Sequence, residues 1–155
     1  WAYLDSLPAA VMLLASQHNS AGNQRGWQLY WDNVTNRFIF GVSADGVTAA
    51  ATVSATTFGA LTTATWYFVV VQYNGVNISI SGNAGAKDTT AYTSDIFNTT
   101  ADFALGTQSA GQAGVFWNGR EAAPVIWTRA LSDQEITWLY NGGLGRSLHT
   151  MKLLP

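Results

Sequence analysis

The sequence predicts an all-β domain, an antiparallel sandwich or jelly roll with one short helix near its C-terminal end. Apolar segments of about four to eight residues, rich in aromatic and β-branched side chains, recur along the chain. Gly, Asn, Asp and Ser, the usual turn formers, bound these segments. A single later segment, residues 132–140, has a helical pattern instead.

The predicted strands of the first half are residues 10–16, 26–32, 37–43, 47–53, 66–73 and 76–81. Two stretches within them alternate as strands with one solvated face do, residues 37–42 and 77–81. Residues 66–71 (WYFVVV) are apolar on both faces, which predicts a central position between layers. Asn74-Gly75 lies between two of these segments and predicts a hairpin with a type I′ turn, whose two central residues need φ > 0.

The helical segment carries its own start and stop signals. Ser132 and Glu135 have the spacing of a capping box, in which each side chain satisfies a backbone N–H that the helix leaves open. Ile136, Leu139 and Tyr140 share one face, and residues 141–143 (NGG) end the helix. A helix this short is unstable alone, so we expect it to pack on the sandwich.

The length of 155 residues suits one domain, which we place at residues 1–143, with an irregular tail at 144–155. The chain opens at Trp1 in what has the pattern of the middle of a strand. We therefore expect a domain that is incomplete at its N-terminus and belongs to a larger protein. In that case a sheet position near residues 1–4 or the tail lacks a neighbour within this chain, since exposed strand edges invite pairing.

The composition argues against several classes of partner. Charged residues make up 10% of the chain, against about 25% in typical soluble domains. The seven Lys and Arg are scattered and the net charge is −2, so no basic surface for nucleic acid is expected. The absence of cysteine rules out disulfides and thiolate metal sites. The longest apolar run, residues 9–15, is far shorter than the roughly 20 residues that span a bilayer, so no membrane insertion is expected.

The acidic residues do not form a catalytic pattern. Glycoside hydrolysis needs two carboxyls about 5–5.5 Å or 6.5–9.5 Å apart, which on a strand means residues two or four positions apart. The only glutamates are Glu121 and Glu135, the latter already explained by the capping box, and no strand carries such a pair. His18 and His149 have no Ser or Asp motif around them. We predict a protein that is not an enzyme.

Aromatic side chains are the best candidates for ligand contact, because the C–H faces of sugars pack on indole rings. Trp27 and Trp31 alternate onto one face of a strand and are expected in the core, as are Trp66 and Trp127. Trp117 and Asn118 lie at a turn, where the ring is either an exposed platform or part of the core. Tyr30 points to the other face of its strand. Arg25 ends a polar loop, residues 18–25, that is either a binding loop or a plain connection.

Calcium is the one metal that the sequence leaves open. Asp32, with Asn33 and Asn36, and Asp45 across the next hairpin carry oxygens of the kind that Ca²⁺ binds. No acidic spacing of the D-x-D type accompanies them, and residues 32–36 (DNVTN) also suit a hairpin loop built on Asx turns. We expect no cofactor other than this possible calcium.

Four stretches of the chain carry a further pattern: residues 1–8 (WAYLDSLP), 66–73 (WYFVVVQY), 103–106 (FALG), and 116–120 (FWNGR) followed by 125–136 (VIWTRALSDQEI). The last of them couples a strand, a turn and a capped helix. These stretches resemble the signatures of laminin-G-like, pentraxin-like domains of the concanavalin A-like type, and they stand in the family's order. Two features depart from the pattern: opening strands before Trp1 are missing, and residues 122–124 (AAP) replace an acidic pair.

The resemblance implies a jelly roll that binds carbohydrate or protein, often at a cell or virion surface, although the fold alone names no ligand. We therefore predict a non-enzymatic carbohydrate- or surface-binding (adhesion) module of a larger extracellular, cell-surface or virion protein. Its expected partners are a glycan or a surface protein and the other chains or domains of an assembly. The alternative is a structural decoration or fibre domain of a phage particle or surface layer, without glycan binding.

Overall fold

The structure is a computed structural model that describes residues 1–7, 9–109 and 115–146. Residues 147–155, most of the predicted tail together with His149, lie outside the described residues. The elements, in chain order, are β1 (Ala2–Leu4), β2 (Met12–Asn19), β3 (Gln24–Asp32), β4 (Arg37–Val42), β5 (Ala51–Ser54), β6 (Trp66–Tyr67), β7 (Val69–Tyr73), β8 (Asn77–Gly82), β9 (Asp88–Ala91), β10 (Phe103–Leu105), β11 (Gly119–Glu121), α1 (Asp133–Tyr140) and a 3₁₀ turn, η1 (Asn141–Gly143).

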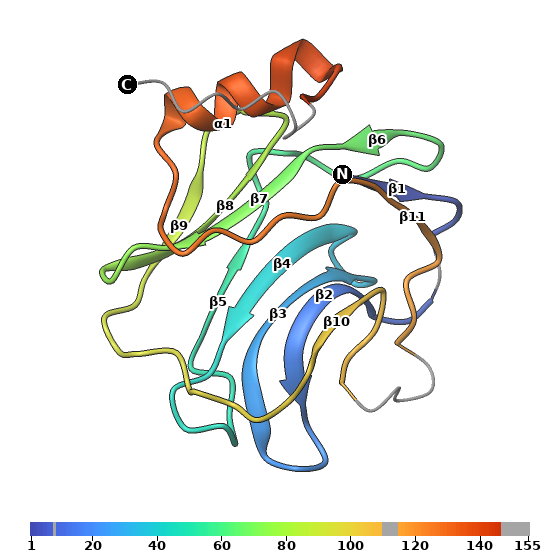
Figure 1. Cartoon of the computed structure of the whole chain (residues 1–155). Coiled ribbons are helices and arrows are strands. Elements are labelled where there is room, and N and C mark those ends of the chain that lie inside the picture. Colours follow the sequence, from blue (N-terminus) through green and yellow to red (C-terminus); the bar gives the residue numbers. More distant parts are fainter. Residues whose placement is uncertain (8, 110–114, 147–155) are drawn as a thin grey trace.

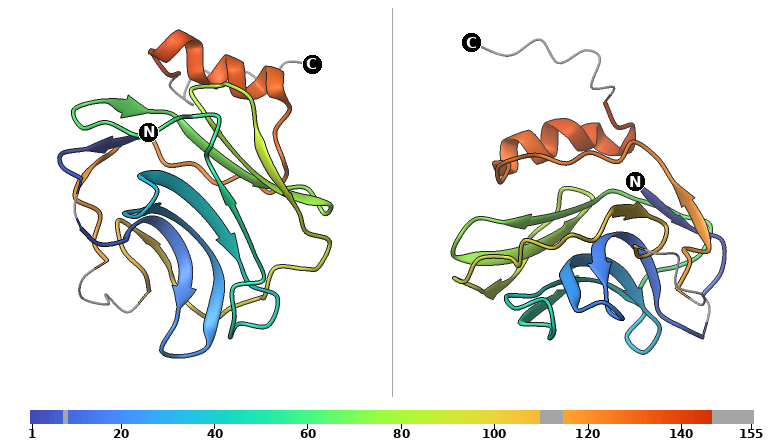
Figure 2. Two further views of the ribbon diagram at one scale, coloured as in Figure 1. Left: turned by 180° about the vertical axis from the view of Figure 1, so that it is seen from behind. Right: turned by 60° about the horizontal axis from the view of Figure 1, so that its bottom comes forward.

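The strands form three antiparallel sheets, which confirms the predicted all-β sandwich. The largest has the order β10-β2-β3-β4-β5, and the two smaller ones have the orders β7-β8-β9 and β11-β1-β6. Figure 1 shows the large sheet below β7–β9, and α1 lying along the far side of β7–β9. The second view of Figure 2 shows the same succession of layers from another side. Within the part of the chain that the structure describes, no helix is long and apolar enough to cross a bilayer.

The core lies between the large sheet and β8. Alternation along β3 and β4 turns Trp31 and Phe38 inward, where they are 1% and 0% exposed. Ile78 and Ile80 of β8 meet them from the opposite layer and are fully buried. Of the aromatic residues expected in the core, Trp31 is confirmed there and Trp27 packs half-buried against it.

The hairpin predicted at Asn74-Gly75 is present, but its turn differs from the expected one. Strands β7 and β8 pair antiparallel, and the N–H of Asn74 donates to the carbonyl of Asn77 (3.2 Å). The two central residues are thus Gly75 and Val76, and only Gly75 has positive φ, at 86°. That is the pattern of a type II′ turn, with Gly at the first central position. The Asn74 side chain caps the turn by accepting the N–H groups of Val76 and Asn77.

Residues 66–73 do not form one strand but split into β6 and β7. Although β7 is the end strand of its sheet, it lies between the large sheet and α1 (Figure 1), so its predicted position between layers is confirmed. Trp66 is 40% exposed, so its expected place in the core is wrong. The strand that the resemblance implies within residues 116–136 is confined to β11, because the following residues 122–131 have no strand structure.

The N-terminal strand is paired on both sides. Ala2 and Tyr3 of β1 face Glu121 and Arg120 of β11 on one side, and Tyr67 and Trp66 of β6 on the other. The expectation of an unpaired neighbour beside residues 1–4 is therefore wrong.

The helix confirms its sequence signals. Ser132 is the N-cap, and both halves of the capping box with Glu135 are formed. Asn141 ends α1 in the left-handed conformation, with φ of 50°. Ile136 is buried, and Tyr140 stacks on Trp1 with ring centroids 5.9 Å apart. The helix thus packs on the sandwich, as expected.

Candidate functional site

A cavity of about 540 Å³ runs along the edge of β7 that faces away from β8. Side chains of the large sheet line one wall, among them Leu14, Leu29 and Phe40. Residues 121–131 form the opposite wall, and Leu139 of α1 also contributes.

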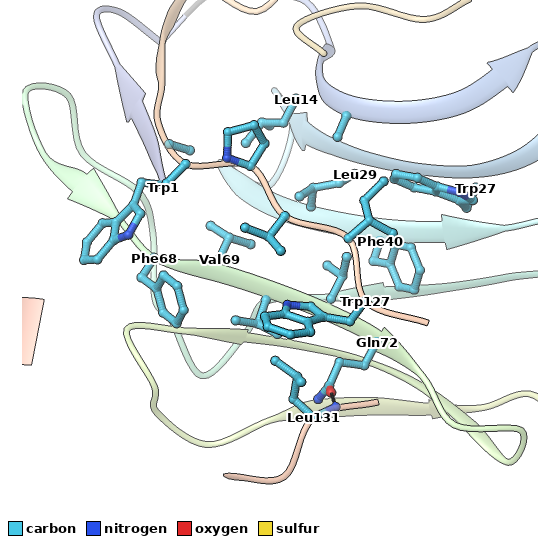
Figure 3. A pocket seen from close by; sticks show the side chains of 18 of the residues that line it. Trp1, Leu14, Trp27, Leu29, Phe40, Phe68, Val69, Gln72, Trp127 and Leu131 are labelled. Carbon is cyan, nitrogen blue, oxygen red and sulfur yellow. Dashed lines mark hydrogen bonds between the residues drawn. The ribbon is translucent and has the colours of Figure 1, made fainter. Parts of the chain in front are cut away.

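Three tryptophans line this cavity, from three distant parts of the chain: Trp1, Trp27 and Trp127. In Figure 3, Trp1 and Trp27 lie at opposite ends of the view, and Trp127 is seen between them. Trp1 packs on Phe68, with ring centroids 5.1 Å apart. Trp127 is half-buried, so it is a wall of this cavity rather than part of the closed core expected from its pattern. Aromatic rings therefore present a broad apolar surface to any occupant.

Residues 122–131 cross the opening of the cavity and are held at both ends. The N–H of Ala122 donates to the Trp1 carbonyl (3.0 Å), and the N–H of Leu131 donates to Oε1 of Gln72 on β7 (2.5 Å). Between these points Trp127 turns inward, whereas Ile126 is 65% exposed. The segment therefore partly covers the cavity.

Glu121 is the one acidic residue among the lining residues that the structure describes. Its Oε1 is buried and accepts no hydrogen bond from the described residues. Burial raises the pKa of Glu121 from its ordinary value of 4.5 to about 7. The carboxyl is therefore able to donate or accept a hydrogen bond near neutral pH, depending on its proton.

Trp117 does not stand free as a platform. It is half-buried and packs on Phe38 of the core, with ring centroids 6.1 Å apart, and its Nε1 is buried. Asn118 is exposed, and its side-chain amide donates to Oγ of Ser6 (2.7 Å). Neither residue lines the cavity.

Tyr30 and Arg25 lie on β3 but outside the cavity. Tyr30 is half-buried between Leu13 of β2 and Ile39 of β4, and this burial raises the pKa of its hydroxyl. Arg25 lies at the start of β3 beside His18, where burial, with the charge of Arg25, lowers the pKa of the imidazole. Residues 20–23 are the turn between β2 and β3, so the loop that precedes Arg25 is a hairpin connection. The four predicted contact residues thus do not form one site.

The two candidate calcium ligands are too far apart to share an ion. Asp32 ends β3 opposite Arg37, whereas Asp45 follows the other end of β4. The six residues of β4 between them span about 20 Å. Asp32 accepts the N–H and hydroxyl of Thr35, and Asp45 accepts the N–H groups of Thr48 and Val47. Those backbone bonds, Thr48 first, lower the pKa of Asp45 to about 2. Both carboxylates therefore act as turn caps.

The sequence reasoning missed Glu121 and Trp127 as cavity residues. It set Glu121 aside because no second carboxyl stands near it along the chain, and it placed Trp127 in the core because of its apolar strand. No local signal marks either residue, because the cavity forms only where β2, β3 and β7 come together. Among the described residues, no group of three or more His, Cys, Asp or Glu is placed to hold a metal ion.

Comparison with known proteins gives a family and one similar structure. A family model described as the concanavalin A-like lectin/glucanases superfamily matches residues 1–137. Among solved structures, the chain is similar to an S-layer domain-containing protein from Clostridium thermocellum, with 18% identity and a TM-score of 0.41. The match covers 90% of this chain and 66% of that one. A search of curated proteins gives no match.

Proposed function

Because this chain belongs to the concanavalin A-like lectin/glucanases superfamily, we propose that it is a non-enzymatic binding module that holds a glycan in the cavity along β7. The observation that carries the proposal is the lining of that cavity: three tryptophans and one carboxyl. The superfamily includes hydrolases as well as binding proteins, so the choice rests on this lining.

The size and chemistry of the cavity suit a short stretch of glycan. Its volume of about 540 Å³ lies within the usual range for small-ligand sites. The C–H faces of pyranose rings pack on indoles as other apolar surfaces do, and Trp27 and Trp127 offer such surfaces. Gln17, Thr128 and Glu121 supply polar atoms among the lining residues for the hydroxyl groups at the ring edges.

The acidic residues support binding without hydrolysis. A glycosidase of either stereochemistry needs a second carboxyl within about 10 Å of the first. All nine acidic residues fall within the described part of the chain, and only Glu121 lines the cavity. Glu135 is committed to Arg129 and the helix cap, which lower its pKa to about 2, and Asp5 pairs with Arg120 (3.4 Å). A lone carboxyl orients a hydroxyl but lacks the partner that would activate water.

The proposed setting is an extracellular, cell-surface or virion protein of which this domain is one part. The charged fraction of 10%, with Thr, Ser, Asn and Gly in place of charged residues, supports an adhesive surface. In that setting several linked copies of a weakly binding module bind a surface more tightly than one copy does, since linked sites raise one another's effective concentration.

The test is a titration of the domain with cellohexaose and chitohexaose, followed by tryptophan fluorescence and by release of reducing ends. We expect saturable binding without hydrolysis, and a loss of affinity of roughly tenfold or more in Trp127→Ala, equal to about 1.4 kcal/mol. Trp138→Ala is the matched control, because Trp138 is a half-buried tryptophan of α1 that does not line the cavity. Equal affinity in parent and Trp127→Ala would refute the cavity as the site, and release of reducing ends would refute the non-enzymatic assignment.

A further inference from the structure

Three side chains form a row across the outer face of the sheet β11-β1-β6. Arg120, Tyr3 and Trp66 are directly opposite one another in the strand register. Their neighbours along each strand point the other way: Ala2 and Leu4 are 1% and 0% exposed, and Glu121 lines the cavity. Since side chains alternate along a strand, the row faces away from both core and cavity.

Members of the row contact one another in sequence. The rings of Tyr3 and Trp66 have centroids 5.3 Å apart and a tilt of 54°. The Arg120 guanidinium lies over the Tyr3 ring, 4.7 Å from its centroid, and pairs with Asp5 (3.4 Å). Gly119 permits this arrangement, because a Cβ at that position would collide with the Tyr3 carbonyl. Strand β11 therefore lies close against β1 and places Arg120 beside Tyr3.

The row remains open to solvent although its members are packed. Trp66 is 40% exposed, and the side chains of Arg120 and Asp5 are 64% and 44% exposed. Three strands about 4.8 Å apart span roughly 10 Å, which is about the length of two pyranose rings. Asn118, one of the contact residues expected from sequence, lies beside the row, where its carbonyl accepts the N–H of Asp5 (3.3 Å).

We infer that this row is a second saccharide-binding surface, separate from the cavity and on the opposite face of β11. One sugar ring stacks on the exposed face of Trp66. Arg120 donates hydrogen bonds and Asp5 accepts them, so the pair serves adjacent hydroxyl groups of the next ring. Arg120 and Asp5 together carry no net charge, which favours a neutral saccharide over a sulfated or phosphorylated one. The inference goes beyond the proposed function, because it concerns a different surface and different residues.

A purely structural role for the row makes a different prediction. Cross-strand aromatic pairs stabilise sheets by roughly 0.2–1 kcal/mol, whether or not a ligand binds. In that case Trp66→Ala lowers stability and changes no ligand response. Stability and ligand response therefore have to be measured on the same variants.

The experiment is a titration of uniformly ¹⁵N-labelled protein with cellohexaose and chitohexaose, because each indole N–H and each backbone N–H reports separately. We expect the Trp66 indole signal to shift at millimolar saccharide and to shift less in Arg120→Gln. In Trp66→Phe the backbone signals of β1 should still shift, but by less than in the parent protein. Trp138→Ala is the matched control: Arg146 lies over the Trp138 ring (4.6 Å), so this pair also joins an arginine to an aromatic ring, but neither residue belongs to the row.

The two sites can fail independently. Shifts at Trp27 and Trp127 with none at Trp66 would overturn the second surface and leave the cavity in place. A shift at Trp66 alone would support the second surface and refute the cavity. A Trp66 shift that is unchanged in Arg120→Gln and in Asp5→Asn would also overturn the inference, because the polar pair would then have no part in binding.

Discussion

Replacing Ile136 by Ala tests how α1 is attached to the sandwich. Ile136 is 3% exposed and is the buried residue of the helix, whereas Leu139 is half-buried and faces the cavity. Ile136→Ala and Leu139→Ala each remove three carbon atoms from the same helix. Their different surroundings should therefore give different losses of stability.

The magnitudes follow from burial. Three buried carbons contribute about 2.4 kcal/mol, at about 0.8 kcal/mol each. The void left at Ile136 adds roughly 1 kcal/mol, for a total loss of about 3–4 kcal/mol. Leu139 is only half-buried and borders an existing cavity, so Leu139→Ala should cost about 1 kcal/mol.

Urea denaturation and thermal melts of both variants measure these losses. For a domain of this size 1 kcal/mol corresponds to about 2–4 °C, so Ile136→Ala should melt roughly 7–14 °C below the parent. Leu139→Ala should melt only about 2–4 °C lower. Equal losses in the two variants, or a larger loss at Leu139, would refute the assignment of Ile136 as the anchor of the helix.

Three further predictions follow from the same structure. Ser132→Ala removes the oxygen that accepts the Glu135 N–H and should lower the free energy of unfolding by about 0.5–2 kcal/mol in urea titrations, whereas unchanged stability would contradict the cap. Because burial raises the folded-state pKa of Glu121 from 4.5 to about 7, stability should fall as pH rises through that window, and Glu121→Gln should abolish this fall; a flat parent curve would show a solvated carboxyl. Millimolar calcium should leave the melting temperature unchanged, and a rise of several degrees that is lost in Asp32→Asn or Asp45→Asn would show a specific site.

Local chemistry made part of this structure readable from the sequence. The capping box at Ser132 and Glu135 depends on residues three positions apart, so its spacing predicts the start of α1 wherever the helix packs. The Asn74-Gly75 pair likewise predicts a hairpin from neighbouring residues alone, and β7 and β8 form it. The predicted type I′ turn is wrong, because the pairing of Asn74 with Asn77 shifts the turn by one residue. Strand periodicity also predicts that Trp31 of β3 points inward. The one solvated face expected of residues 37–42 and 77–81 is wrong, because β4 and β8 are buried on both faces.

Position within the sheets depended on distant segments. Residues 66–71 are apolar on both faces, which predicts a position between layers. That position holds for β7, but Trp66 lies on the surface beside Tyr3. An apolar pattern records that a strand meets apolar surface on both sides. It does not record whether that surface is a second sheet, a cavity or a neighbouring ring.

The candidate sites were decided by tertiary structure alone. Glu121 gains its raised pKa from burial where β11 pairs with β1, a strand at the opposite end of the chain. Asp32 and Asp45 are near in sequence but lie at opposite ends of β4, so they cannot act together. The type of each side chain and the period of each strand are properties of the local sequence. Which side chains lie next to one another is set by long-range strand pairing and packing, and a binding site consists of side chains that lie next to one another.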